Sequence, residues 1–274
     1  MNPASLTNQA ERRRFLIKAL LSERGEQMPR GIPANAERQR ALLRALMNIR
    51  PPQEIDTGLL SVQDAYLQAE RARRGTVDLA SIPALDPSDP VRTRMHLWRG
   101  DITQLGTDAI MNAANSRMLG CFVPGHQCID NAIHTYAGIQ LRLACAELMG
   151  EQEHDEPTGH VKATPGFNLP CRYVLHTVGP IVSNRTPRPH HADQLRSCYR
   201  SCLAAATDLM CTSLAVCCLS TGIFGYPPRE AARIALEEVT QYLTDTDPAL
   251  HVVFDVFSET DERIYRDLMD ALQP

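Results

Sequence analysis

Residues 213–227 have the sequence SLAVCCLSTGIFGYP, and this stretch carries a strong signal for the class of fold. Its first half, Ser213 to Leu219, is a short apolar run of the kind that forms a buried strand, and a helical pattern begins at Pro228. The glycines of the connecting loop let successive backbone amides converge, and neighbouring hydroxyls add hydrogen-bond donors. This loop is therefore predicted to hold a diphosphate, with the candidate ligand-binding residues Ser220, Thr221, Gly222, Ile223 and Phe224. Phe224 can flank a ribose or simply anchor the loop.

The alternation of strand and helix extends over the rest of residues 90–274. Apolar runs predict strands at Met95–Trp98, Ala109–Asn112, Tyr173–Thr177, Ser213–Leu219 and His251–Val256. Helical spacing predicts helices at Ile129–Met149, Ala192–Met210 and Pro228–Thr244. Alternating strands and helices are typical of an α/β sandwich with a mostly parallel sheet, whose ligands bind at the carboxyl ends of the strands.

Residues 1–90 have a different character. Apolar residues recur at helical spacing in residues 11–23, 37–49 and 62–73, and three prolines between residues 82 and 90 indicate a linker. Three short helices bury little surface, so we expect them to pack their apolar faces on the larger domain. The predicted domains are a helical N-terminal extension at 1–90 and the α/β domain at 91–274.

Composition narrows the class of protein. Of the 274 residues, 43% are hydrophobic and 22% are charged, which is typical of a globular protein. The formal net charge of -4 provides no general basic field, so we expect no DNA partner. No apolar stretch is long enough to predict a membrane span. The nine cysteines are odd in number and lack the spacing of a disulfide framework, which favours a reducing, cytoplasmic location.

Two strand ends carry polar side chains suited to a nucleotide ligand. In Gly-Asp-Ile-Thr at 100–103, the carboxylate of Asp101 can accept from an amino group such as that of adenine, and the backbone of Ile102 adds a directional partner. An Asp at this place can equally form a turn or cap a helix. In residues 111–115, the amides of Asn112 and Asn115 can bind sugar hydroxyls, or can hold a turn through their own backbone.

A candidate metal site follows in residues 121–128, which have the pattern C-x4-H-x-C. The thiolates of Cys121 and Cys128 and the imidazole of His126 can reach one zinc ion, and two thiolates neutralise its charge. Three protein ligands leave one coordination position open, as in catalytic zinc sites. Two alternatives remain: the cysteines are buried thiols beside a satisfied histidine, or a distant residue such as Cys171 completes a structural site.

These stretches, in this order, resemble the macrodomain family. The matching motifs are GDIT, NAAN, TPGFNLPCRYVLHTVGP at 164–180 and STGIFGYP. The resemblance implies a three-layer α/β sandwich with a mixed, mostly parallel central sheet. Residues 120–130 replace the usual run of glycines, and together with the helical segment 41–52 they resemble the zinc-dependent subgroup, which bears an N-terminal extension.

The resemblance implies a ligand, a reaction and partners. It places ADP-ribose with adenine near Asp101, the diphosphate over residues 220–224, and the distal ribose between Asn115 and a zinc ion. The implied activity is zinc-dependent hydrolysis of mono-ADP-ribose from Asp and Glu side chains of modified proteins, at ribose C1''. Some relatives are encoded with a sirtuin-type ADP-ribosyltransferase and a lipoylated carrier protein.

The expected catalytic residues are Asn115, Cys121, His126 and Cys128. The zinc would either lower the pKa of a bound water to ~7 or polarise a ribose hydroxyl and orient the sugar. Asp130 is the nearest candidate for a general base, although an acid there can also cap the following helix. Two other functions use the same pocket: a reader module that binds ADP-ribosylated proteins without cleavage, and a deacetylase of O-acetyl-ADP-ribose.

Overall fold

The computed structural model describes residues 6–26, 31–246 and 249–271, so the outermost residues of both predicted domains lie outside the described ranges. The chain begins with three helices, α1 (Gln9–Glu23), α2 (Ala36–Ile49) and α3 (Thr57–Arg74). Each starts at a polar cap, because the side chains of Asn8, Asn35 and Asp56 accept hydrogen bonds from backbone amides in the first turn. The predicted helical segments of the extension are confirmed, and α3 begins earlier than the pattern indicated.

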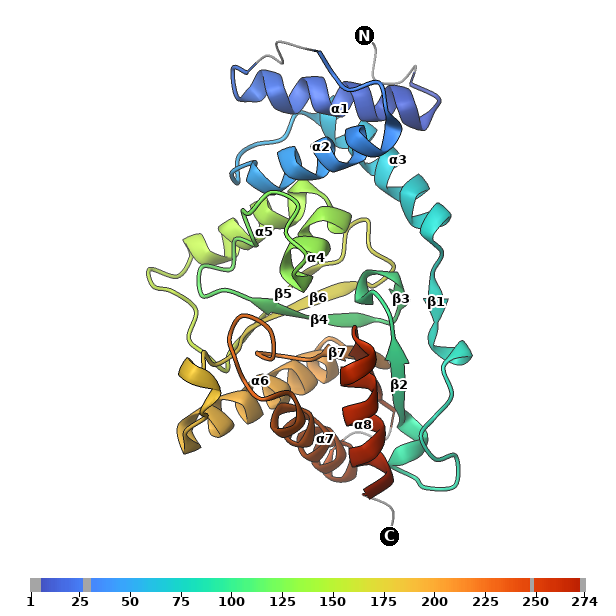
Figure 1. Cartoon of the computed structure of the whole chain (residues 1–274), viewed down its shortest axis with the longest axis vertical. Helices are drawn as coiled ribbons and strands as arrows, with labels where there is room; N and C mark the ends of the chain where they lie inside the picture. Colours follow the sequence, from blue (N-terminus) through green and yellow to red (C-terminus); the bar gives the residue numbers. More distant parts are fainter. Residues whose placement is uncertain (1–5, 27–30, 247–248, 272–274) are drawn as a thin grey trace.

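A six-stranded sheet forms the centre of the remaining chain (Figure 1). Its order is β2 (Met95–Arg99), β8 (His251–Val256), β7 (Ser213–Cys217), β4 (Ala109–Ala114), β6 (Tyr173–Val178) and β5 (Val161–Pro165). All neighbouring strands are parallel except β5, which runs antiparallel to β6. All five predicted strands are present, and the mixed, mostly parallel sheet is confirmed.

Helices cover both faces of this sheet, which confirms the predicted three-layer sandwich (Figure 1). One layer contains α4 (Ile129–Ala137) and α5 (Ile139–Gly150), and the other contains α6 (Pro189–Asp208), α7 (Pro228–Asp245) and α8 (Glu259–Ala271). The prediction of one helix over 129–149 is wrong in one respect, because the segment forms two helices. Gly138 has φ 106° and separates α4 from α5. The strand β5 and the helix α8 were not predicted.

The core of the sandwich fills the space between the sheet and its helices. It is a single apolar cluster whose largest fully buried side chains include Tyr199, Tyr226 and Phe254. The central strand β7 is buried at every position, as its continuous apolar run predicts. The strands therefore form a rigid platform for the loops that follow them.

The N-terminal helices form a further layer on α4 and α5 (Figure 1). Their own apolar cluster includes Leu16, Leu43 and Tyr66, and it extends to Ile139 at the start of α5. From α3 the chain continues through β1 (Val77–Asp78), which pairs in parallel with β3 (Leu105–Gly106). The short 3-10 turns lie at Leu79–Ser81, Arg92–Arg94, Ile102–Gln104 and Ser183–Arg185. None of the described helices is long and apolar enough to cross a bilayer.

Candidate functional site

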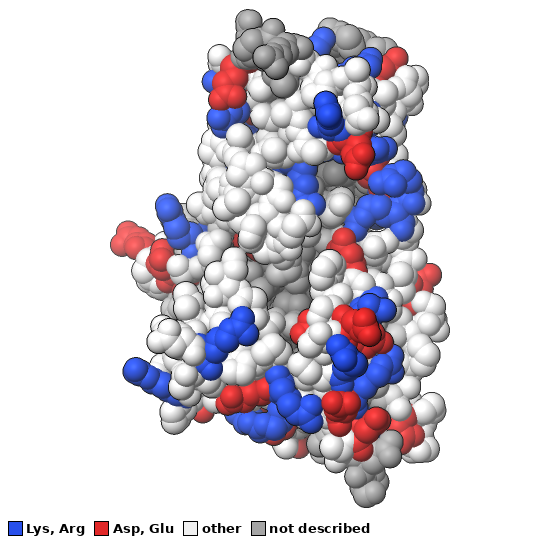
Figure 2. Space-filling model, viewed as in Figure 1, with Lys and Arg blue, Asp and Glu red and all other residues white. Residues whose placement is uncertain are grey.

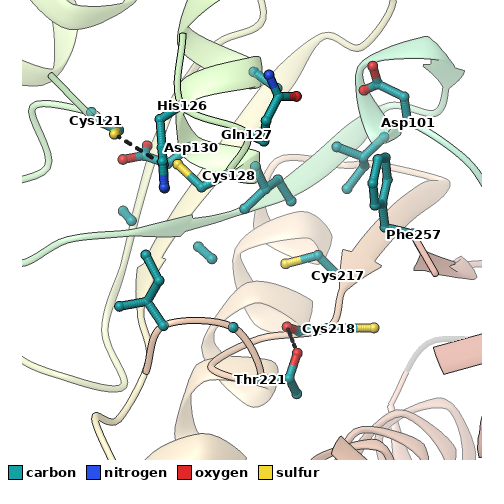
Figure 3. Close-up of a pocket in the computed structure, with 18 of the residues that line it drawn as sticks. Asp101, Cys121, His126, Gln127, Cys128, Asp130, Cys217, Cys218, Thr221 and Phe257 are labelled. Carbon is teal, nitrogen blue, oxygen red and sulfur yellow. Dashed lines mark hydrogen bonds between the residues drawn. The ribbon is translucent and has the colours of Figure 1, made fainter. Parts of the chain in front are cut away.

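A pocket of about 710 Å³ opens at the carboxyl ends of the central strands. Figure 2 shows it as a hollow in the middle of one face, and Figure 3 shows the side chains that point into it. The loops after β2, β4, β7 and β8 contribute to its wall, as the topology of a parallel sheet predicts. Of the residues predicted to form the site, the structure gathers these around the pocket: Asp101, Ile102, Asn115, Cys121, His126, Cys128, Ser220, Thr221, Gly222, Ile223 and Phe224.

Asp101 and Phe257 lie together at one end of the pocket (Figure 3). The Oδ1 atom of Asp101 accepts hydrogen bonds from the backbone amide of Thr103 at 3.0 Å and from its hydroxyl at 2.6 Å. Its Oδ2 atom accepts one from Arg74 at 2.7 Å, and 32% of the side chain remains exposed. Asp101 therefore caps the turn, as one interpretation of this motif predicts, and its carboxylate also lines the pocket. Adenine binding by Asp101 stays a prediction.

The two asparagines that follow β4 have different places. Asn115 lies in the pocket wall, where Nδ2 donates to the carbonyl of Gly120 at 3.1 Å and Oδ1 accepts from the amide of Arg117 at 3.1 Å. Asn112 is fully buried, and its Nδ2 contacts Asp130 and His176. The prediction that Asn112 binds sugar hydroxyls is therefore wrong in this structure, because Asn112 lies two residues before the end of β4, where Asp130 and His176 contact its side chain.

The loop after β7 presents backbone rather than positive charge to the pocket. Ser220 adopts φ 65°, and its buried hydroxyl has no hydrogen-bond partner within the described chain. The Thr221 hydroxyl donates to the Cys218 carbonyl at 3.0 Å, which fixes the turn. Among the described lining residues, Arg44 is the only arginine or lysine. An anion in this loop must therefore be held by amides and hydroxyls, as the sequence indicates.

Cys121, His126 and Cys128 converge at the other end of the pocket (Figure 3). Their ligand atoms all lie within 4.8 Å of one another, and Sγ of Cys121 is 3.6 Å from Nδ1 of His126. Burial, with a smaller effect from Cys121, raises the pKa of Cys128 to about 11, so its thiol stays neutral until a cation is bound. Two sulfur atoms and an imidazole nitrogen in a half-buried cluster fit a zinc ion.

The open side of this cluster faces the cavity. All three side chains line the pocket, and Cys171 lies in the apolar core, outside this group. The geometry therefore does not favour Cys171 as a fourth ligand. A second group, His134, Cys145 and His176, is fully buried, but both ring nitrogens of His176 already contact Asn112 and Thr164. Cys121, His126 and Cys128 form the better metal site, because their ligand atoms make fewer hydrogen bonds within the protein and face the pocket.

Asp130 lies behind the metal-binding residues and also reaches the pocket wall. It does not cap α4, because the amide of Asn131 donates instead to Sγ of Cys128 at 3.4 Å. Its Oδ1 atom accepts from Asn112 at 2.9 Å and lies 3.5 Å from Nε2 of His134. Burial raises the pKa of Asp130 to about 6. The capping interpretation is therefore wrong, and the carboxyl stands beside the cluster.

The chain is similar to proteins of one known family. The Macro domain model matches residues 111–235, which include the last four residues of β4, the Cys121–Cys128 loop and β7. A protein-ADP-ribose hydrolase of Treponema medium is 48% identical over 265 residues, which are 95% of this chain and 99% of the relative. The chain belongs to the macrodomain family.

The similarity to other macrodomain proteins also extends over most of the chain. A protein-ADP-ribose hydrolase of Staphylococcus aureus is 40% identical over 263 residues, which are 96% of this chain and 97% of the relative. The crystal structure of the Trypanosoma brucei macrodomain in complex with ADP-ribose has a TM-score of 0.65 and 33% identity, and the match covers 82% of this chain and 94% of that one. The similarity to the two hydrolases thus extends into the N-terminal helices.

Several residues around the macrodomain pocket were not predicted. Phe257 follows β8 with its side chain 78% exposed, and the strand-end rule applied to residues 251–256 points to it. Asp255 is 7% exposed, lines the pocket and has an Oδ1 atom without a partner among the described groups. Arg44 and Tyr136 come from α2 and α4, and no local pattern distinguishes them from other helix residues.

Proposed function

We propose that this macrodomain is a zinc-dependent hydrolase that removes mono-ADP-ribose from Asp and Glu side chains of modified proteins. One observation carries the proposal: Cys121, His126 and Cys128 converge in the wall of the same pocket that contains Asn115 and the loop 220–224. A module that only binds ADP-ribose has no use for an open metal position beside the sugar. The two relatives from Treponema medium and Staphylococcus aureus are named protein-ADP-ribose hydrolases, which favours the same class of activity.

The dimensions and chemistry of the pocket suit ADP-ribose. Asp101 can accept from the adenine amino group, and the exposed ring of Phe257 offers a stacking surface beside it (Figure 3). The loop 220–224 provides amides and hydroxyls for the diphosphate, without a lysine. The distal ribose then extends towards Asn115 and the Cys121–Cys128 cluster, so the ester that joins it to the protein lies at the pocket mouth.

The residues of the cluster have separate roles in this proposal. Cys121, His126 and Cys128 hold the zinc, and Asn115 orients the distal ribose through its amide. The bound ion supplies a Lewis acid that either lowers the pKa of water to ~7 or polarises a ribose hydroxyl. Asp130, held by the Asn112 amide at 2.9 Å, is the candidate proton acceptor next to the cluster.

The proposal is tested by one set of assays on the purified protein. ADP-ribose release is measured from a protein modified on Asp and Glu, with and without a zinc chelator and after zinc is restored. We expect release that falls with the chelator and returns with the metal. Release that is insensitive to the chelator contradicts the zinc requirement, and binding without any release favours the reader function.

A parallel assay with O-acetyl-ADP-ribose separates the deacetylase. That substrate contains the same sugar and an ester of the same chemistry. A protein that hydrolyses O-acetyl-ADP-ribose but not the modified protein would therefore be a deacetylase. A sirtuin-type transferase and a lipoylated carrier protein stay predictions of the family resemblance, and a cytoplasmic location stays a prediction from the cysteine pattern.

A further inference from the structure

We propose that the N-terminal helix α2 fixes the conformation of the loop 119–128, with Asn48 and Arg44 acting as positioning residues for the three metal ligands. The inference rests on the proposed function, because it concerns the same metal site. It assigns to the helical extension a direct part in the site. The contacts that carry it come from residues separated by more than 70 positions in the sequence.

Asn48 connects α2 to the turn between the first two ligands. Its side chain is 1% exposed, and Oδ1 accepts a hydrogen bond from the amide of Gly125 at 2.9 Å. Its Nδ2 atom donates to the hydroxyl of Thr135 on α4 at 3.0 Å. Gly125 has φ 65°, a conformation that side-chain-bearing residues rarely adopt. Asn48 thus holds the special backbone position of the loop, one residue before His126.

Arg44 makes the second connection, on the other side of the same ligand. Its Nη2 atom donates to the carbonyl of His126 at 3.0 Å and to Oδ1 of Asn131 at 2.8 Å. Asn131 in turn donates from Nδ2 to the carbonyl of Val123 at 3.0 Å and from its amide to Sγ of Cys128 at 3.4 Å. One guanidinium therefore links α2 to His126 directly and to Cys128 through a single residue.

Arg142 secures the beginning of the loop to the same helix. Its Nε atom donates to the carbonyl of Leu119 at 2.7 Å, and its Nη1 atom donates to the carbonyls of Met47 and Arg50 at the end of α2. The guanidinium also lies 4.0 Å from the centre of the Phe122 ring. Because this side chain is only 4% exposed, these contacts are made away from bulk water.

These contacts matter because the loop has no regular secondary structure between Gly120 and Cys128. A loop that orders only when metal binds loses conformational entropy at that step, and a loop already ordered by its neighbours does not. Groups that orient metal ligands without touching the metal typically change metal affinity ~10 to 100-fold when they are removed. We therefore expect α2 to raise the zinc affinity of the site.

The test measures Zn²⁺ affinity of the full chain by competition with a chromogenic chelator. Asn48→Ala and Arg44→Met should each weaken Zn²⁺ binding ~10 to 100-fold, as expected for lost orienting groups. Asn48→Asp keeps an oxygen acceptor for the Gly125 amide, so it should recover most of the affinity. Asn35→Ala removes the cap at the other end of α2 and should leave the affinity unchanged.

Amide hydrogen exchange of the metal-free protein gives a second measurement. The Gly125 amide should be protected in the wild type and in Asn35→Ala, and it should exchange faster in Asn48→Ala. Variants that bind Zn²⁺ as tightly as the wild type, with Gly125 still protected, contradict the inference and leave the proposed function intact. A wild type that binds no Zn²⁺ contradicts the proposed function and the inference together.

Discussion

Nη2 of Arg74 donates to Oδ2 of Asp101 at 2.7 Å, so a helix of the N-terminal extension orients the carboxylate predicted to bind adenine. The same guanidinium donates to the hydroxyl of Thr103 at 2.7 Å and lies 3.7 Å from the centre of the Tyr136 ring. The charge of Asp101 is thereby balanced without being removed from the pocket. An adenine amino group would meet an acceptor that is already in place, which lowers the entropy lost on binding.

Asp101→Ala should weaken ADP-ribose binding by ~1 to 3 kcal/mol, the usual cost of losing a hydrogen bond to a charged group. Isothermal titration calorimetry with ADP-ribose measures this directly. The variant should still fold, because Arg74 keeps its contacts with Thr103 and Tyr136. Asp86→Ala, at an exposed carboxylate in the 82–90 segment, should bind as the wild type does. Unaltered affinity in a folded Asp101→Ala protein would remove this residue from the site.

The sandwich was predictable because its strands and helices carry their signals locally. The apolar run at His251–Val256 is a strand with the same limits in the structure. The strand β5 was missed because Val161–Pro165 contains Lys162, Thr164 and a proline, as an edge strand can. The helix α8 was missed although Ile264, Tyr265, Leu268 and Met269 recur at helical spacing, with Tyr265 and Met269 as its buried positions. Both elements lie at the boundary of the core.

The sequence predicted only those parts of the site that lie at strand ends or that show the spacing of metal ligands. Loops after parallel strands gather at one edge of the sheet, so Asp101 and Thr221 were expected to line the same binding site. The burial of Asn112 depends on its contacts with Asp130 and His176, and the contacts of Arg44 depend on how α2 docks. Docking is a tertiary property, and the helical spacing of α2 indicates its apolar face without showing which loop that helix will contact.

Asp255→Asn tests the ionisation of a carboxyl in the pocket wall. Burial, with a smaller effect from the charge of Asp101, raises the pKa of Asp255 well above its usual value of 3.8. The folded state therefore favours the protonated carboxyl of Asp255. The contribution of this carboxyl to the free energy of unfolding is fully present below pH 3.8 and is lost as the pH rises towards the pKa of Asp255 in the folded protein. Over that range the loss is about 1.4 kcal/mol per pH unit.

The asparagine cannot ionise, so Asp255→Asn should gain stability over the wild type as the pH is raised from 4 to 7. Urea unfolding at several pH values within this range measures the difference. Asp208→Asn, at an exposed position on α6, should show no comparable trend. A stability difference that is independent of pH would mean that folding does not raise the pKa of Asp255.

Elemental analysis of the untagged protein should find about one zinc per chain, as expected for one site with three protein ligands. Cys121→Ser and Cys128→Ser together should remove the metal, because serine hydroxyls do not replace two thiolates. Cys218→Ser alters another cysteine of the pocket wall and should retain it. Metal that persists in the double variant would overturn the assignment and direct attention to the buried group of His134, Cys145 and His176.

His126→Ala and Asn115→Ala should separate catalysis from binding. If the zinc and the ribose contact act mainly in the transition state, both variants lower the rate of ADP-ribose release from ester-linked protein far more than they lower ADP-ribose affinity. We expect a fall in rate of at least ~10 to 100-fold, since the loss of groups that only orient a metal ligand already has an effect of this size. Single-turnover assays and calorimetry on the same preparations provide the two quantities.

Asp101→Ala serves as the contrasting variant for this comparison. It touches the adenine end of the pocket, so it should weaken binding and change the rate at saturating substrate much less. Equal losses of rate and affinity in His126→Ala would place that residue in ligand binding alone. A zinc-loaded wild type that binds ADP-ribose yet releases none from Asp and Glu esters would exclude the hydrolase, favour the reader, and leave the metal as a structural support for the loop 119–128.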